Sequence, residues 1–414
     1  MATLSVRGRR VAVTAGSRLL AASLSAREEE RNIEKLFMYD CSAAEKRLPD
    51  DKEEEASAVV AGSDKILASA FSCSGSYFAV TDDNKRLILF RTDPAWQCLS
   101  VRFVVRRCTA LTVTAAEDRV FVADKSGDVY SFSVTDPQAK GRLELGHLSM
   151  LLHLAVSPDD KYIITADRDE KIRVSLLRAP HNIAAFCLGH TEFVTQVLVL
   201  SSAPDLLVST SGDQTLKLWE YENGREVQSC SLSGCRQQDG NGEHKKSFAV
   251  SRIASCSHGR HIAVLFDCVP AVHIFQFEAA SRQLRLQQEI CLEHIVWDIA
   301  FDGSSGLWML QESEEEPILL YRLKEETWQR SLDDGVARMS NHLRDNWTLM
   351  EECRGTESCY RNLYKASYDN MATYLRKKEE RILEQQQKKR KEAKGAQQPA
   401  NVQTQTLQPA MPAS

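Results

Sequence analysis

The sequence lacks the long hydrophobic segments that would place it in a membrane. No run of about 18 apolar residues occurs among its 414 positions, so no transmembrane helix is predicted. The N-terminal segment from Met1 to Ser17 contains no continuous apolar stretch and no small-residue cleavage site, so we do not predict a secretory signal. The short apolar segment from Val11 to Val13 is better interpreted as a first strand.

Cysteines with metal-ligand spacing are also missing. The 12 cysteines are scattered singly and never form a Cys-x-x-Cys pair. The closest pairs, Cys230 with Cys235 and Cys353 with Cys359, have no histidine at ligand spacing. We therefore predict no metal site, and free thiols that suit a reducing nucleus or cytosol.

Motifs that hold a cofactor are absent as well. The one Gly-x-Gly, from Gly240 to Gly242, lies in polar sequence with no buried strand before it and no helix after it. There is no glycine-rich loop with a phosphate-binding lysine. The sequence therefore predicts that this chain binds neither a nucleotide nor S-adenosylmethionine.

Charge is unevenly distributed along the chain. The formal net charge is −5, but residues 376–394 hold nine Lys or Arg against four Asp or Glu. Because residues 395–414 carry no charge, residues 1–375 carry −10. An acidic body with a basic tail predicts that any nucleic-acid contact is local and includes the tail.

A repeat is the strongest positive signal. Residues 206–220, LLVSTSGDQTLKLWE, have the strand–turn–strand pattern of a WD repeat, and Gly189-His190 precedes Trp219 at the separation usual for such a repeat. Six further positions match Trp219, at spacings of 42 to 56 residues: Tyr39, Phe90, Phe132, Ser175, Phe275 and Tyr321. Since a four-stranded blade occupies about 40–45 residues, we predict an all-β fold, a seven-bladed β-propeller over residues 1–350.

The remaining segments complete the predicted organisation. Residues 48–58 are acidic and residues 233–246 are polar, so both are predicted to be mobile surface loops. Residues 360–394 are predicted to form a basic helical tail, since they are rich in strong helix formers. Residues 395–414, rich in Gln and Pro, are predicted to be disordered.

Histidine, serine and aspartate recur together in a way that resembles a hydrolase triad. His190, Ser209, Asp213 and Trp219 have the spacing of the hydrogen-bonded tetrad of a WD repeat, which satisfies buried polar groups. The set recurs one repeat earlier as His147, Thr165 and Asp169, with Ser175 in place of Trp. A catalytic triad would not be duplicated at the repeat period, so a structural tetrad is favoured over a propeller hydrolase.

Two charged segments are candidate binding sites. The segment 165–173, TADRDEKIR, is either an exposed turn or a docking site for a specific partner. Strand parity predicts that Arg173 reaches solvent near the strand end, so its loss should cost little fold stability. The basic tail is a nuclear import signal, a phosphate-binding strip or a solvated helix. Its candidate nucleic-acid-binding residues are Arg376, Lys377, Lys378, Arg381, Lys388, Lys389 and Arg390.

Several strings resemble one known family. They are YDCSAAEKR (39–47), SGSYFAVTDDNKRLILFRT (74–92), VADKSGDVYSFSV (122–134), VSPDDKYIITADRDEKIRVS (156–175) and LGHTEFV (188–194). They are similar to the vertebrate WD-repeat non-catalytic subunit of tRNA (guanine-N7-)-methyltransferase. The similarity covers nearly the whole propeller and continues at LYKASYDN (363–370).

The resemblance implies a heterodimer with a Rossmann-type catalytic subunit, which binds S-adenosylmethionine. The basic run 388–391 favours a nuclear location for the protein. Together the two chains would form N7-methylguanosine in the variable loop of tRNA, and this chain would stabilise its partner and help to position the tRNA. It also implies that the partner contacts Asp169, Glu170, Lys171 and Arg173. The alternative is a general WD-repeat interaction scaffold, such as a ubiquitin-ligase adaptor or a replication or chromatin factor.

Overall fold

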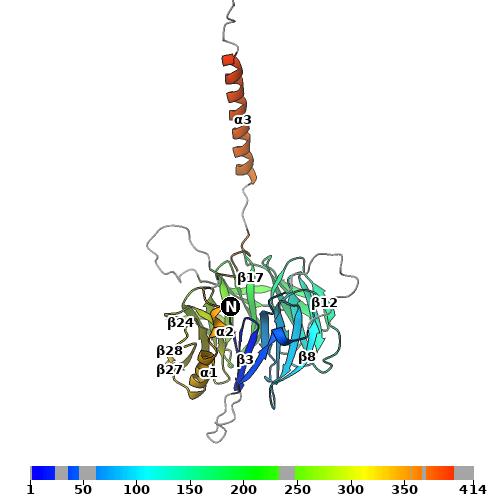
Figure 1. Ribbon diagram of the computed structural model, residues 1–414, viewed down its shortest axis with the longest axis vertical. Helices are drawn as coiled ribbons and strands as arrows, with labels where there is room; N and C mark the ends of the chain where they lie inside the picture. Colours follow the sequence, from blue (N-terminus) through cyan, green and yellow to red (C-terminus); the bar gives the residue numbers. More distant parts are fainter. Residues whose placement is uncertain are drawn as a thin grey trace, which may run out of the picture. The chain divides into compact units, whose positions relative to one another are not determined.

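The computed structural model describes residues 2–23, 36–45, 62–232, 248–355, 357–365 and 370–395. Two compact units make up the chain, Met1–Tyr364 and Lys365–Ser414, and each is described by itself. The first unit contains seven sheets of four antiparallel strands, each sheet built from strands consecutive in the sequence (Figure 1). The predicted seven-bladed β-propeller is confirmed.

The strands of the first four blades are β1 to β16. Their bounds are Thr3–Arg7, Arg10–Ala15, Arg18–Ser23 and Phe37–Asp40 in blade 1; Ile66–Phe71, Tyr77–Asp82, Arg86–Arg91 and Gln97–Phe103 in blade 2; Cys108–Val113, Arg119–Asp124, Asp128–Ser133 and Arg142–Gly146 in blade 3; and Leu151–Val156, Tyr162–Asp167, Ile172–Leu176 and Ala179–Cys187 in blade 4.

Strands β17 to β28 form the other three blades. Their bounds are Val194–Leu200, Ala203–Ser211, Thr215–Glu220 and Arg225–Ser231 in blade 5; Val250–Ser255, His261–Phe266, Ala271–Glu278 and Gln283–Cys291 in blade 6; and Val296–Phe301, Leu307–Gln311, Ile318–Lys324 and Thr327–Arg330 in blade 7. A short 3-10 helix, Cys41–Ala43, follows β4, and helices α1 (Asp334–Asp345) and α2 (Thr348–Glu351) follow β28.

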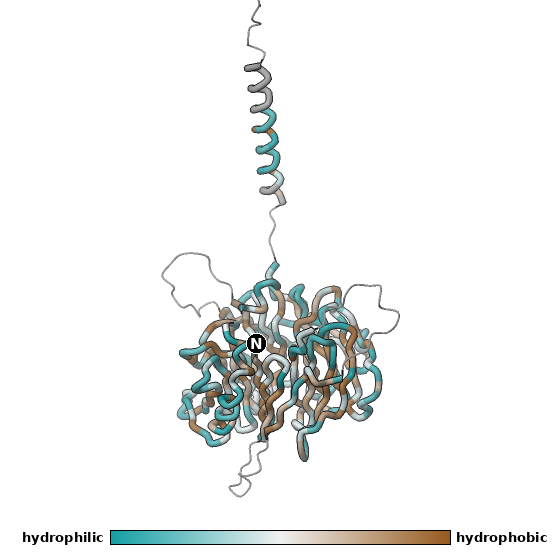
Figure 2. The backbone as a smooth tube through the Cα atoms, viewed as in Figure 1, coloured by the Kyte–Doolittle hydropathy of each residue, from teal (hydrophilic) through white to brown (hydrophobic). Residues whose placement is uncertain are grey.

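The second strand of a blade is apolar on both faces because both faces are covered by neighbouring blades. In β22, HIAVLF, and in β14, YIITAD, every residue is buried. Alternation of apolar and polar residues is therefore lost in these strands, whereas the outer strand β16 is mostly exposed. Hydrophobic residues accordingly concentrate within the ring of blades (Figure 2).

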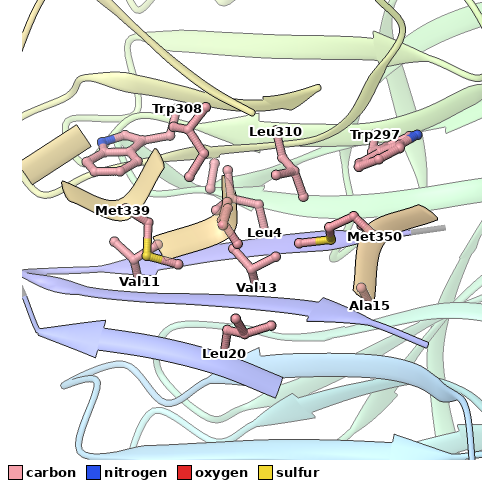
Figure 3. Packing of buried hydrophobic residues seen from close by; sticks show 14 of the residues in the cluster. Leu4, Val11, Val13, Ala15, Leu20, Trp297, Trp308, Leu310, Met339 and Met350 are labelled. Carbon is pink, nitrogen blue, oxygen red and sulfur yellow. The ribbon is translucent and has the colours of Figure 1, made fainter. Parts of the chain in front are cut away.

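Helices seal the ring where its ends meet. Among the described residues, blade 1 uses the first four strands and blade 7 the last four, so no strand is exchanged between them. Instead, the side chains of Met339 in α1 and Met350 in α2 join Leu4 and Val13 of blade 1 and Leu310 of blade 7 in one buried cluster (Figure 3). The rings of Trp297 and Trp347 stack in the same cluster, with centroids 6.0 Å apart.

One of the six positions that the repeat pattern matched to Trp219 was wrong. Phe90, Phe132, Ser175, Trp219, Phe275 and Tyr321 lie on the third strands of their blades, but Tyr39 lies on the fourth strand, β4. Blade 1 has no aromatic residue on its third strand, RLLAAS, so the template matched the next aromatic position along the chain. The number of blades was unaffected because blade 1 still supplied one match.

The second-to-third-strand turns and the links between blades lie along one face of the ring, here called the link face. Backbone hydrogen bonds join each of these turns to a neighbouring link. The Lys125 N–H donates to the Arg107 carbonyl at 3.2 Å, and the Arg168 N–H donates to the Met150 carbonyl at 2.9 Å. The predicted loops 48–58 and 233–246 and residues 396–414 lie outside the described residues.

Candidate docking site on the fourth blade

An aspartate closes the five-residue turn between the second and third strands in three consecutive blades. In blade 4 this residue is Asp167, whose Oδ1 accepts the Lys171 N–H at 3.0 Å. Asp82 and Asp124 accept the N–H of Arg86 and Asp128 in the same way, each at 3.0 Å. The carboxylate satisfies a backbone donor that the turn leaves unpaired and holds the turn in one conformation.

In blade 5 the structure brings the predicted tetrad together. His190 Nδ1 lies 2.9 Å from Asp213 Oδ2, and His190 Nε2 lies 2.7 Å from Ser209 Oγ. Trp219 Nε1 donates to the same Ser209 Oγ at 2.8 Å. Because the Asp213 carboxylate can only accept, His190 Nδ1–H donates to it, and Ser209 Oγ, which accepts from Trp219, donates its own proton to His190 Nε2. Burial raises the Asp213 pKa, but hydrogen bonds from His190 and Thr215 outweigh it and lower the pKa to about 2.

In blade 4 the predicted aspartate of the second tetrad was wrong. His147 Nδ1 lies 3.1 Å from Asp167 Oδ2, and His147 Nε2 lies 2.8 Å from Thr165 Oγ1. Blade 5 has Ser211 at the first position of its turn, so its histidine pairs with the third residue, Asp213. Blade 4 has an aspartate at both positions, and the first one binds the histidine. Asp169 is thereby left out of the network.

The expectation that Arg173 reaches solvent was also wrong. Arg173 is only 8% exposed, and burial lowers the pKa of its guanidinium. Its Nε donates to Ser175 Oγ at 2.9 Å, and its Nη1 and Nη2 donate to the carbonyls of Gly146 and Pro180, each at 3.0 Å. Ser175 occupies the strand position that Trp219 has in blade 5. The Arg173 guanidinium therefore connects β15 and β16 of blade 4 with the outer strand β12 of blade 3, beside the position that lacks the usual tryptophan.

Lys217 occupies the position of Arg173 in blade 5 and is buried as well. Its Nζ donates to Glu226 Oε2 at 2.9 Å and to Ser229 Oγ at 3.1 Å. Lys217 thus bonds only within blade 5, whereas Arg173 bonds Ser175 and Pro180 in blade 4 and also Gly146 on β12 of blade 3. The inward orientation is a feature of the repeat, but Arg173 reaches backbone carbonyls where Lys217 reaches side chains.

The exposed part of the site is the turn itself. Asp169 and Glu170 are half-buried, Lys171 is exposed, and the Lys171 Nζ donates to the Asp169 carbonyl at 3.2 Å. Glu170 has a φ of 71°, in the left-handed region, which the hydrogen bonds of the turn maintain. The turn presents charges of both signs on a supported backbone, an arrangement suited to binding a complementary protein surface.

Apolar side chains flank this charged turn. Leu148 follows His147 directly, and Leu188 lies between the end of β16 and Gly189; both are exposed. Phe186, which pairs with Arg173 across the β15–β16 ladder, is also exposed. Charged groups beside exposed large apolar residues are typical of the centre and rim of a protein–protein interface.

In the tail, helix α3 spans Asn370–Gly395. The side chains of Arg376, Lys377, Lys378 and Arg381 are exposed, and the helix backbone continues through Lys388, Lys389 and Arg390. Over the described ranges, no three His, Cys, Asp or Glu side chains are grouped so as to hold a metal ion. Within the same ranges, no helix has the length and apolar character needed to cross a membrane.

Comparisons with known proteins agree with these observations. Residues 23–142 and 133–318 match the family described as the tRNA methyltransferase TRM82 WD40 domain. The tRNA (guanine-N(7)-)-methyltransferase non-catalytic subunit WDR4 of Mus musculus is 54% identical over 379 residues, covering 91% of this chain and 89% of that protein. The Homo sapiens relative with the same description is 52% identical, covering 90% and 89%.

Solved structures show the fold alone. The chain resembles the RRP9 WD40 repeats with a TM-score of 0.59 and 16% identity, covering 76% of this chain and 88% of that one. It resembles a chain of the mitotic checkpoint complex with a TM-score of 0.58 and 14% identity, covering 80% and 87%. The sequence relatives are far more identical, at 52–54% over about nine tenths of both chains, and they show that this chain belongs to the family of WD-repeat non-catalytic subunits of tRNA (guanine-N7)-methyltransferase.

Proposed function

We propose that this non-catalytic subunit docks a Rossmann-type catalytic methyltransferase on the link face of blade 4 and helps to hold the tRNA. The partner binds S-adenosylmethionine and transfers the methyl group to N7 of a guanine in the variable loop. Asp169, Glu170 and Lys171 contact the partner. Arg173 supports their turn from within the blade.

The observation that carries this proposal is the set of hydrogen bonds in and beside the turn. Asp167 closes the turn and binds His147, while Arg173 bonds Gly146 and Pro180 on the strands beside it. A turn held this way loses little conformational freedom when a partner binds, so more of the interaction energy appears as affinity. The exposed Leu148, Phe186 and Leu188 add apolar area around the charges.

The basic tail supplies the RNA contact in this proposal. Lys and Arg side chains such as Arg376, Lys377, Lys378 and Arg381 neutralise phosphates and release counterions without reading sequence. This chemistry suits a structured RNA, whose shape is read through its backbone. The run from Lys388 to Lys391 would also serve as the signal that directs the protein to the nucleus.

Charge reversal in the turn tests the docking site. In the full-length chain, Asp169→Lys combined with Glu170→Lys should weaken binding of the catalytic subunit at least tenfold, because two favourable charge contacts become repulsive. The control is Glu293→Lys, an exposed acidic residue in the link between blades 6 and 7 on the same face. Affinity is measured by calorimetry. Wild-type affinity in the double variant, or an equal loss in the control, would contradict the proposal.

A further inference from the structure

The chain does not leave the propeller where its last strand ends. After β28 in blade 7, α1 and α2 pack into the cluster between blades 7 and 1. The Gly355 N–H then donates to Glu312 Oε1, next to β26 of blade 7, at 3.1 Å. Residues 357–364, here called the strap, continue from this point and are the last residues of the propeller unit.

The strap crosses from blade 6 to blade 4. Tyr360 Oη donates to the Ser251 carbonyl of blade 6 at 3.4 Å. At its end, the Arg168 Nε donates to the Leu363 carbonyl at 3.3 Å. Arg168 is the second residue of the turn that carries Asp169 and Glu170. The strap therefore ends in direct contact with the proposed docking turn.

Aromatic packing fixes the middle of the strap. Phe193, in the link between blades 4 and 5, is fully buried; its ring stacks with that of Tyr360 at 5.9 Å and 5°, and meets Tyr364 edge-on at 4.9 Å. A Cβ on Gly212 would lie 2.6 Å from the Phe193 ring, so the glycine makes room for this anchor. The Leu363 N–H donates to the Tyr360 carbonyl at 2.9 Å, which closes a turn over the anchor.

We propose that the strap is a positioning element that sets the origin of the basic tail beside the site where the catalytic subunit docks. Arg168, Phe193 and Tyr360 are its positioning residues. The inference rests on the proposed function. A chain that left the propeller at blade 7 would do so on the opposite side of the ring from the docking turn, whereas the strap ends the propeller unit at blade 4, where the Leu363 carbonyl accepts from Arg168.

A tail that starts beside the docking site has a higher local concentration at the bound RNA. Binding by a tethered segment depends on its effective concentration at the site, which falls roughly as the −3/2 power of tether length. The positions between Tyr364 and the start of α3 are only 365–369. Lengthening this connection from five residues to about 25 should lower the effective concentration of the tail on docked RNA by about tenfold.

The test is an insertion of about 20 Gly and Ser residues after Lys365 in the full chain, assayed in the complex with the catalytic subunit. The matched control carries the same insertion after Gly395, beyond α3. We expect the KM for tRNA to rise about tenfold in the first variant only, with kcat and the Kd for the catalytic subunit unchanged. A second variant, Phe193→Ala with Tyr360→Ala, releases the strap and should raise KM in the same way while the propeller still melts cooperatively.

The outcomes separate this proposal from the proposed function. An unchanged KM after the insertion at Lys365, or an equal rise in both insertions, would overturn the role of the strap while the wild-type complex still methylates tRNA. If the wild-type chain fails to bind the catalytic subunit or to support methylation, the proposed function itself is wrong.

Discussion

At the residue scale, the tetrad of blade 5 accounts for a buried histidine that would otherwise be unpaired. Asp213→Ala removes the acceptor for His190 Nδ1 and for the Thr191 N–H. It should lower the free energy of unfolding by about 1–3 kcal/mol, the cost of leaving a buried polar group without a partner. Denaturant unfolding checks this, with Asp205→Ala, an exposed residue of the same blade, as the control that should change little. Unchanged stability together with lost methylation would show that the tetrad is not structural.

His153 on the inner strand β13 makes stability depend on pH. Burial, with a contribution from Arg252, lowers its pKa to about 3, and its Nδ1 accepts the Val197 N–H at 3.4 Å. Since the folded pKa lies below the unfolded value of about 6.5, the neutral ring stabilises the fold fully above pH 6.5. This contribution is lost as the pH falls toward 3.

His153→Gln should remove that dependence because glutamine retains an acceptor but takes up no proton. Between pH 6.5 and 5, where most carboxylates remain ionised, the wild-type free energy of unfolding should fall by up to about 1.4 kcal/mol per pH unit more than that of the variant. Parallel urea titrations at several pH values measure the difference. Identical slopes for the two proteins would contradict a lowered pKa for His153.

The side-chain errors of the sequence prediction arise from tertiary structure that local sequence patterns do not contain. Strand parity correctly separates Arg173 from Ile172 and Val174, but in a propeller the second face of a sheet is also covered by a blade. Parity therefore does not predict exposure here. Which aspartate binds His147, Asp167 or Asp169, depends on the geometry of the turn. The sequence has an aspartate at both positions and does not distinguish them. Arg168 and Phe193 were not singled out because their contacts are with the distant residues Leu363 and Tyr360.

At the element scale, Arg173 belongs to the hydrogen-bond network that holds blade 4 together beside the proposed docking turn. Arg173→Leu leaves the Gly146 and Pro180 carbonyls without their donors, so it should destabilise the propeller by about 1–3 kcal/mol. It should also weaken binding of the catalytic subunit, because the turn loses its support. Lys171→Ala should weaken binding without lowering stability, since Lys171 is exposed.

The control for this pair is Lys217→Leu in blade 5. It removes the bonds to Glu226 and Ser229 and should cost stability without affecting partner affinity. Thermal melting and calorimetric titration on all three variants provide the comparison. If Lys217→Leu weakens partner binding as much as Arg173→Leu, general destabilisation of the propeller explains the loss and a local role of blade 4 is excluded.

The sequence predicts the helices better than it predicts how the helices and the strap pack on the propeller. The tail helix is evident from a run of strong helix formers, but α3 covers Asn370–Gly395 and not the predicted start at residue 360. Residues 360–364 belong to the strap, because Tyr360 and Tyr364 pack on Phe193 of the propeller. Helix α1 begins at a capping aspartate, Asp333, whose side chain accepts the Gly335 N–H at 2.8 Å. Its sealing role depends on contacts with β1 and β2 near the opposite end of the sequence, which no local pattern contains.

At the scale of the whole molecule, the repeat spacing predicts the seven-bladed ring from the sequence, but it does not predict how the first and last blades meet. Spacings near one blade length predict seven sheets whatever the local errors, which is why misplacing Tyr39 left the blade number intact. Closure by helices instead of an exchanged strand is a property of the chain ends. A repeat pattern describes neighbouring blades and carries no information about how its first and last members meet.

The central claim is that this chain enables methylation by a partner and performs none itself. The most direct test measures transfer of a labelled methyl group from S-adenosylmethionine to tRNA by this chain alone, by the catalytic subunit alone and by an equimolar mixture. The account predicts no turnover by this chain alone and much higher activity in the mixture than in the catalytic subunit alone. Turnover by the isolated chain, or a mixture no more active than the catalytic subunit, would contradict it.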